Sequence, residues 1–177
     1  ILDAGISRVV FSTVDPNSRH AGRALRLLKS KGVEVAYGIL SDLSAELNAA
    51  FNHWIITGLP FVTVKAAMTL DGKIASVSGE SKWITGSLAR REGMKLRHEV
   101  DAILVGVKTI LNDDPALTLR DIRRPKREWR GPDLKRIVLD PRARTPLDTK
   151  ILNDDGAART TIIVSPNASV SRLAKLE

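Results

Sequence analysis

The chain has 177 residues, of which 43% are hydrophobic and 27% are charged, and it has no cysteine. This length and composition are typical of an ordinary soluble globular protein, and they exclude disorder or a fibre as a description of the whole chain. Without cysteine, disulfides and cysteine-ligated zinc sites are excluded as well. No apolar run approaches the roughly 20 residues that span a bilayer, so we expect no membrane partner and a cytoplasmic location. The chain starts at Ile1 rather than at a methionine, and we expect both of its ends to belong to a longer protein.

The formal net charge of +8 is concentrated in one segment, between Arg120 and Arg136. Eight basic and three acidic residues give this segment a net charge of +5. It also contains Pro125, Gly131 and Pro132 and has no hydrophobic period, which favours an exposed, solvated loop. A role in gathering phosphate is the second interpretation. Nucleic-acid binding is the least favoured, because no groove-reading helix accompanies the charge.

The first third of the chain alternates apolar runs with helical patterns, as α/β proteins do. We expect strands at 8–14 and 33–36, separated by a helix at about 22–30 with Leu25, Leu27 and Leu28 facing inward. A longer helix starts at Ser41 or Asp42, and its residues Leu43, Leu47, Phe51 and Trp54 are spaced to share one face. The segment 57–60 ends this unit, and the pattern of strands and helices then starts again.

The second part of the chain predicts another α/β unit. We expect strands at 61–68, 102–106, 136–140 and 160–164, a helix from Thr85 or Ser87 to about His98, and a short helix at 107–111. The last residues have the pattern of a helix start. The fold class is therefore α/β, in two units that join near Gly58 and Pro60.

Few residues carry recognisable chemistry by themselves. His20, His53 and His98 are scattered without a second ligand at metal-binding spacing, so we expect them to be structural or surface residues and expect no metal site. No P-loop and no GxGxxG fingerprint is present. Polar residues do gather after the predicted strands of the second unit, where ligands of α/β proteins bind. Turns, caps and surface salt bridges would explain the same residues, and the composition alone favours that explanation.

An ordered series of short motifs runs from Lys65 to Arg120. It consists of KAAMTLDGKIA at 65–75, GESKWIT at 79–85, AR at 89–90, LR at 96–97, DAILVG at 101–106 with Thr109, and DDPALTLR at 113–120. This series resembles the reductase domain of the bifunctional deaminase/reductase family of riboflavin biosynthesis. The motifs AGI at 4–6, DPN at 15–17, AGR at 21–23 and LN at 47–48 with Phe51 resemble the end of that family's deaminase domain.

The resemblance implies a domain organisation and an activity. Residues 1–58 would be the C-terminal part of a cytidine-deaminase-like domain, and residues 59–177 the N-terminal part of a dihydrofolate-reductase-like domain that binds NADPH without a GxGxxG loop. The reaction implied is the reduction of the ribose of 5-amino-6-(5-phosphoribosylamino)uracil to a ribityl chain. The substrate would thus be a small phosphoribosyl-pyrimidine, and a homo-oligomer is left open.

Site residues follow from the resemblance position by position. The residues on the NADPH side would be Ala67, Trp83, Thr109 and Asp113. Those on the substrate side would be Ser81, Arg97, Leu117 and Arg120, and two arginines suit a sugar phosphate because guanidinium groups give paired hydrogen bonds to its oxygens. Lys65 and Asp71 are candidates for orienting the substrate or handling protons, although neither can be assigned a step.

Several features depart from the family pattern. The H-x-E motif and the cysteine pair that hold the deaminase zinc are absent from this sequence, so zinc and deaminase (hydrolase) activity are expected only in a longer protein. Ala24 stands where the family usually has a second glycine, and the reductase's later glycine-rich segment would lie beyond Glu177. A non-catalytic nucleotide-binding or regulatory domain that kept the fold is therefore the main alternative, followed by a basic nucleic-acid-binding module.

Overall fold

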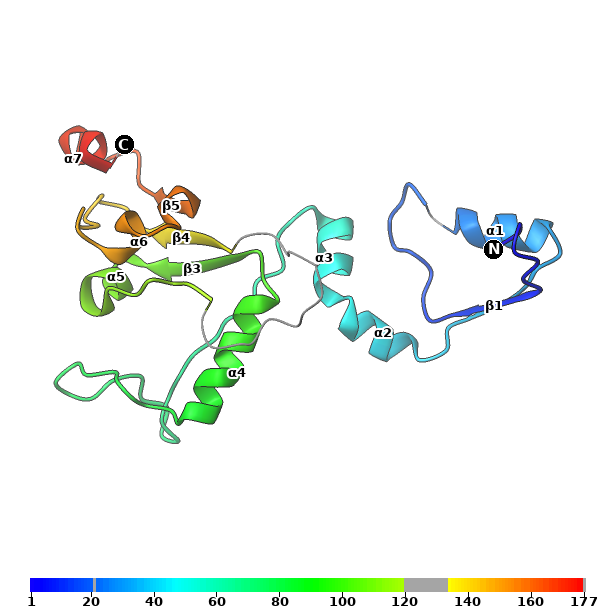
Figure 1. Cartoon of the computed structure of the whole chain (residues 1–177), viewed down its shortest axis with the longest axis horizontal. Helices are drawn as coiled ribbons and strands as arrows, with labels where there is room; N and C mark the ends of the chain where they lie inside the picture. Colours follow the sequence, from blue (N-terminus) through cyan, green and yellow to red (C-terminus); the bar gives the residue numbers. More distant parts are fainter. Residues whose placement is uncertain (21, 120–133, 177) are drawn as a thin grey trace. The chain divides into compact units, whose positions relative to one another are not determined.

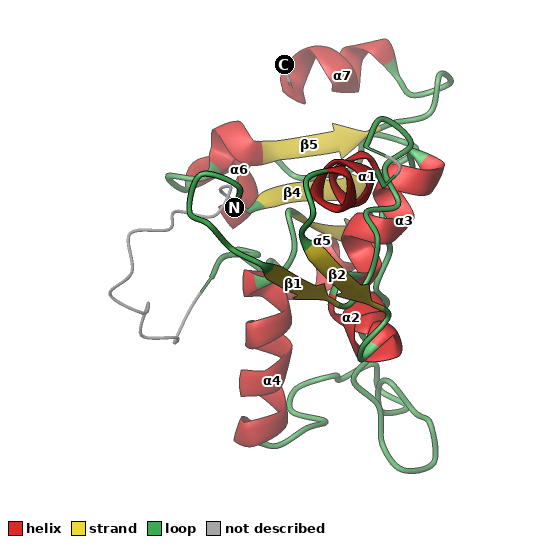
Figure 2. Cartoon of the chain, turned by 90° about the vertical axis from the view of Figure 1, so that its right-hand side faces the viewer, coloured by secondary structure: helices red, strands yellow, loops and turns green. Residues whose placement is uncertain are grey.

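The computed structural model describes residues 1–20, 22–119 and 134–176. The chain divides into two compact units, residues 1–64 and residues 65–177, each of which has its own parallel sheet. Among the described residues, no helix is long and apolar enough to cross a membrane. The α/β class predicted from the sequence is confirmed by both sheets (Figure 1 and Figure 2).

Unit 1 is a small βαβ arrangement followed by two helices. Strands β1 (Arg8–Phe11) and β2 (Glu34–Tyr37) pair in parallel, and helix α1 (Arg23–Ser30) connects them. Gly32, at φ 77°, lies between α1 and β2, in the left-handed region that glycine adopts without strain. Helices α2 (Ser41–Leu47) and α3 (Ala49–Thr57) complete the unit. Figure 2 shows the two paired strands beside α1.

Unit 2 contains a three-stranded parallel sheet in the order β3-β4-β5, with β4 in the centre (Figure 1). Its elements are α4 (Ser87–His98), β3 (Ala102–Gly106), α5 (Val107–Asp113), β4 (Lys135–Leu139), α6 (Lys150–Asn153), the 3₁₀ helix η1 (Ala157–Arg159), β5 (Thr160–Ile163) and α7 (Val170–Leu176). Leu104 pairs with Ile137, and Ile137 pairs with Thr161, which fixes the register of the sheet. Side chains alternate across a strand, so this register also decides which residues enter the core.

The core of unit 2 forms between β4 and the helices α5 and α6. It consists of Val107, Ile110, Leu117, Val138 and Ile151, each at most 4% exposed. Burial of one such side chain is worth about 1.5–3 kcal/mol relative to leaving it in water. Leu117 belongs to no helix or strand, and its burial therefore fixes the loop that follows α5 to the sheet.

The expected strand at 61–68 is wrong, because the structure has neither helix nor strand between α3 and α4. Val62 and Val64 are 75% and 87% exposed, and within the described ranges no strand pairs with this segment. A strand is stable only where a neighbour satisfies its backbone groups, and an apolar, β-branched composition does not supply that neighbour.

The helix expected from residue 41 onward is divided in two at Asn48, whose side chain donates a hydrogen bond to the Ser44 carbonyl at 2.8 Å. Its proposed inner face is exposed, with Leu47 at 86% and Trp54 at 55%. In α1, Leu28 is buried as expected, but Leu27 is 50% exposed. The spacing of hydrophobic residues thus predicted where the helices lie, but it did not predict which helix faces are buried.

The burial of Arg136 is a further correction. The strand expected to start at this residue is confirmed as β4, but Arg136 also counts in the segment expected to be solvated, and it is only 2% exposed. The rest of that segment, residues 120–133, lies outside the described residues. Arg136 points into the protein because it has an acidic partner, Asp154, that is 18 positions further along the chain.

Candidate functional site

A hollow of about 310 Å³ lies within residues 69–84 of unit 2, in the irregular segment that precedes α4. It is lined by Thr69, Lys73, Ala75, Ser76, Glu80, Ser81, Lys82, Trp83 and Ile84. Two of the residues predicted from the sequence, Ser81 and Trp83, are therefore brought together here. Polar side chains, two lysines and one large aromatic surface give the hollow the mixed character of a small-molecule site.

One wall of this hollow is a turn built by Thr69, Asp71 and Lys73. The Thr69 hydroxyl donates to the Asp71 carboxylate and accepts from the Lys73 backbone N–H at 2.9 Å. Lys73 Nζ lies 2.8 Å from Asp71 Oδ2. The lysine first, and then the threonine hydroxyl, hold the pKa of Asp71 below its ordinary value, so its carboxylate is ionised at neutral pH. Gly72, at φ 77°, provides the left-handed residue that the turn requires.

The other wall carries Trp83, which is 73% exposed. The Arg90 guanidinium lies over its ring, 4.3 Å from the centroid, and Arg90 Nη1 donates to the Thr85 carbonyl at 2.6 Å. Next to Trp83, Lys82 Nζ lies 3.8 Å from Asp113 Oδ1. This ion pair joins the segment that contains Trp83 to Asp113. Both residues were assigned to the cofactor in the sequence analysis, and they are 30 positions apart.

The segment Asp113–Leu119, which starts at the last residue of α5, carries two of the predicted residues, Asp113 and Leu117. Asp114 and Leu117 are non-glycine residues with positive φ, 40° and 48°. Arg97, from α4, donates to the Thr118 carbonyl at 3.1 Å, which brings a second predicted substrate residue to the neighbourhood of Leu117.

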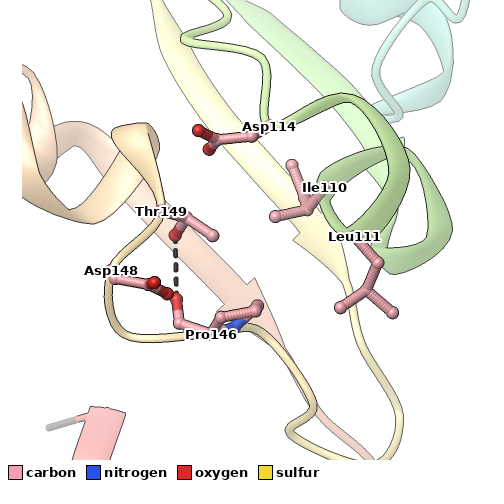
Figure 3. Close-up of a pocket in the computed structure, with 6 residues that line it drawn as sticks. All are labelled: Ile110, Leu111, Asp114, Pro146, Asp148 and Thr149. Carbon is pink, nitrogen blue, oxygen red and sulfur yellow. Dashed lines mark hydrogen bonds between the residues drawn. The ribbon is translucent and has the colours of Figure 1, made fainter.

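A second, smaller hollow of about 200 Å³ borders the same segment (Figure 3). Asp114, Ile110 and Leu111 form one side, and Pro146, Asp148 and Thr149 form the other. The backbone N–H of Lys150 donates to Asp114 Oδ1 at 2.9 Å, and its Nζ lies 3.1 Å from Oδ2. Lys150 thereby lowers the pKa of Asp114 and keeps it ionised. This arrangement fixes the segment Asp113–Leu119 to the start of α6.

The remaining predicted residues are placed less closely. Ala67 is half-buried in the irregular segment before the turn, and Thr109 is half-buried on α5, but neither lines the larger hollow. Lys65 is exposed and its side chain extends along α4, where a Cβ on Gly93 would lie 3.4 Å from its Cε. Arg120 lies outside the described residues.

Sequence reasoning missed four residues that shape this region: Lys82, Arg90, Lys150 and Arg136. Lys82 and Arg90 stand inside the quoted motifs, but their partners could be found only from the fold. For Arg136 the sequence itself contained a signal. A charged residue at the start of a strongly apolar strand requires a buried partner.

The fold and the site together define an α/β domain with a polar, lysine-bearing hollow near the start of unit 2. One of the lining residues, Lys82, forms an ion pair with Asp113 at the end of α5. Residues 60–177, two thirds of the chain, match the RibD C-terminal domain. The chain belongs to this family.

Similar proteins extend over the whole chain. Riboflavin biosynthesis protein RibD of Aquifex aeolicus is 39% identical over 98% of this chain and 47% of its own length. The protein of that name from Actinobacillus pleuropneumoniae is 43% identical over 92% of this chain and 41% of its own length. The chain thus spans less than half the length of these relatives.

Solved structures agree with the sequence comparison. The structure of Acinetobacter baumannii RibD matches 99% of this chain and 48% of its own chain, with a TM-score of 0.81 and 38% identity. A Thermotoga maritima diaminohydroxyphosphoribosylaminopyrimidine deaminase/5-amino-6-(5-phosphoribosylamino)uracil reductase matches 95% of this chain and 46% of its own, with a TM-score of 0.76 and 34% identity.

Proposed function

We propose that this chain carries part of an NADPH-dependent reductase of riboflavin biosynthesis. The substrate is 5-amino-6-(5-phosphoribosylamino)uracil, and reduction of its ribose gives the ribitylamino product. The observation that carries this proposal is the match of residues 60–177 to the RibD C-terminal domain. Residues 59–177 would form the first part of a dihydrofolate-reductase-like domain, and residues 1–58 the end of a deaminase domain whose zinc site this sequence lacks.

The residues around the larger hollow fit a nicotinamide dinucleotide. The exposed ring of Trp83, held from one side by Arg90, offers a flat surface for a heterocycle. The Lys82–Asp113 pair supplies both a cation for a phosphate and a carboxylate for a ribose hydroxyl. We assign Ala67, Trp83, Thr109 and Asp113 to the cofactor side. NADPH, when bound, supplies the hydride, and the protein's part is placement and exclusion of water.

Substrate binding is assigned to Ser81, Arg97, Leu117 and Arg120. Ser81 lines the hollow together with Trp83. Arg97 donates a hydrogen bond to the carbonyl of Thr118, the residue after Leu117. The two arginines would bind the substrate phosphate, since their planar guanidinium groups form paired, charged hydrogen bonds to phosphate oxygens.

The state of Asp71 limits its role in the reaction. A general acid near neutral pH needs a pKa close to the working pH, but Lys73 and Thr69 lower the pKa of Asp71. Asp71 is therefore suited to accepting hydrogen bonds from substrate hydroxyls rather than to donating a proton. Lys65, which is exposed beside α4, is the remaining candidate for proton delivery.

The proposal is tested on the gene product that carries this chain. NADPH is titrated by calorimetry, and oxidation of NADPH at 340 nm is followed with and without the phosphoribosylaminouracil. We expect saturable NADPH binding and substrate-dependent oxidation, both weakened by Trp83→Ala. NADPH binding without oxidation would favour a non-catalytic nucleotide-binding domain, and the absence of both would overturn the proposal.

A further inference from the structure

Arg136 makes an unusual set of contacts for a residue in a central strand. Its Nη1 donates to Asp154 Oδ2 at 2.7 Å and to the Ala116 carbonyl at 3.0 Å. Its Nη2 donates to Asp154 Oδ1 at 2.9 Å and to the Ile151 carbonyl at 2.9 Å. One buried guanidinium therefore joins β4, the start of the turn after α6, α6 itself and the loop after α5.

The contact with Ala116 is the one that concerns the candidate site. Ala116 lies in the segment Asp113–Leu119, between two residues with positive φ, Asp114 and Leu117. Non-glycine residues hold this conformation only when their surroundings enforce it. The enforcing contacts are Lys150 on Asp114, Arg136 on the Ala116 carbonyl, the core around Leu117, and Arg97 on the Thr118 carbonyl.

The anchor at Ala116 is also the most firmly held of the polar ones. Arg136 is 2% exposed and its partner Asp154 is 27% exposed, whereas Lys150 and Asp114 are 61% and 43% exposed. A bidentate arginine–carboxylate pair fixes the orientation of the guanidinium plane. The direction of the Ala116 carbonyl, and with it the course of the chain into Leu117, is set by that plane.

We propose that Arg136 is a positioning residue for substrate binding: by gripping the Ala116 carbonyl from inside the domain, it holds Leu117 and the residues after it in the shape that receives the substrate. This inference rests on the proposed reductase function. Arg136 does not line the larger hollow. Its hydrogen bond to this segment is to the backbone carbonyl of Ala116, the residue before Leu117, so its effect is transmitted by the backbone of that segment.

The test compares three forms of the gene product. Arg136→Lys keeps the charge but replaces the planar fork with a single ammonium group, which cannot reach Asp154, Ala116 and Ile151 in the same geometry. Ile151→Val is the matched control, because it perturbs the same core and leaves its own backbone acceptor in place. Folding of each form is established by circular dichroism, and KM and kcat are measured for the phosphoribosylaminouracil at saturating NADPH.

We expect Arg136→Lys to raise the substrate KM about tenfold, the size expected for one lost hydrogen bond to a charged group, with kcat and the Kd of NADPH little changed. Ile151→Val should keep the KM of the wild type. Amide hydrogen exchange at Asp114 and at residues 116–118 should accelerate in Arg136→Lys and not in Ile151→Val.

Each outcome decides the matter. A folded Arg136→Lys form with the wild-type KM would overturn the positioning role and leave the proposed function intact. A wild-type protein without NADPH-dependent reduction would overturn both. If Arg136→Lys does not fold, Asp154→Asn is used instead, because this substitution weakens the hold on the Arg136 guanidinium but keeps the guanidinium itself. An unchanged substrate KM in the Asp154→Asn form would equally overturn the inference.

Discussion

At the scale of single residues, the Asp154 carboxylate links the stability of unit 2 to pH. Hydrogen bonds from Arg136, and then from the Gly156 backbone N–H, hold the pKa of Asp154 below its ordinary 3.8. The folded state therefore binds a proton more weakly than the unfolded state. The contribution of the pair is fully present above about pH 4 and is lost as the pH falls through the lower pKa of the folded state.

We expect Asp154→Asn to be less stable than the wild type at pH 7 by about 3 kcal/mol, because it leaves the buried Arg136 without its charge partner. The difference should shrink as the pH falls below about 4, where the wild-type carboxylate takes up a proton. Urea denaturation of both forms at a series of pH values measures this. Two curves that stay parallel into the acid range would show that Asp154 does not contribute through its charge.

Gly156 provides a steric test of the same pair. A Cβ at this position would lie 3.0 Å from Arg136 Nη2 and 3.2 Å from Arg136 Cζ, and 3.0 Å from Arg159 Nη2. The backbone itself tolerates alanine, since φ is −100°. We expect Gly156→Ala to cost about 1–3 kcal/mol, the usual range for overpacking a well-filled interior.

Gly86→Ala is the matched control for this substitution. Gly86 also has a negative φ, −67°, and nothing lies within 4 Å of the added Cβ. The free energy of unfolding of Gly86→Ala, measured by chemical denaturation, should differ from that of the wild type by no more than about 0.5 kcal/mol. Equal losses in the two variants would indicate that the glycines matter for backbone reasons and not for the space beside Arg136.

At the scale of elements, local patterns located several helices and strands correctly. The strand expected at 102–106 is confirmed as β3, and the helix expected to end near His98 is confirmed as α4. The strand expected at 61–68 fails because a strand depends on a partner that its own sequence does not specify. The short helix α6 was missed, since four residues are too few to show a hydrophobic period.

The site shows the same division. Motif resemblance selected Ser81 and Trp83, and the structure places them in one hollow. The partners that hold the site, such as Lys82 on Asp113 and Arg136 on the Ala116 carbonyl, join positions 20 or more residues apart. Such pairs are set by the register of the sheet and by the loop conformation, which composition and periodicity do not reveal.

Substitutions at the proposed substrate residues and at the proposed cofactor residues should affect different ligands. If Arg120 holds the substrate phosphate, Arg120→Ala should weaken substrate capture by about 1.5–3 kcal/mol, the range for hydrogen bonds to charged groups. The Kd of NADPH should then barely change. Trp83→Ala and Thr109→Ala should do the reverse, raising the Kd of NADPH while sparing substrate binding.

Arg124→Ala is the control, since it removes the same charge from the same basic segment. We expect it to leave the substrate KM unchanged at physiological salt, because salt screens a charge that makes no direct contact with the substrate. If Arg120→Ala and Arg124→Ala behave alike in correctly folded protein, Arg120 belongs to a general basic surface and its assignment to the substrate fails.

At the scale of the whole molecule, the chain consists of two units whose connection is neither helical nor paired. The structure divides them between Val64 and Lys65, and the family match begins at Pro60. From Gly58 to Val64 the chain is exposed throughout, with Leu59 at 61% and Val64 at 87%. Proteases require a backbone that can leave its surroundings locally, and few buried contacts oppose this here.

We therefore expect a non-specific protease at low concentration to cleave the gene product first between residues 58 and 64 or in the basic segment before β4, with mass spectrometry to locate the cuts. The strand β3 should resist, because every residue from Ala102 to Gly106 pairs with the central strand β4. Its side chains Ile103 and Val105 also pack against the core that contains Val138. Early cleavage inside 102–107 would contradict the proposed organisation, because the strand that leads into α5 would then be less stable than the connection between the units.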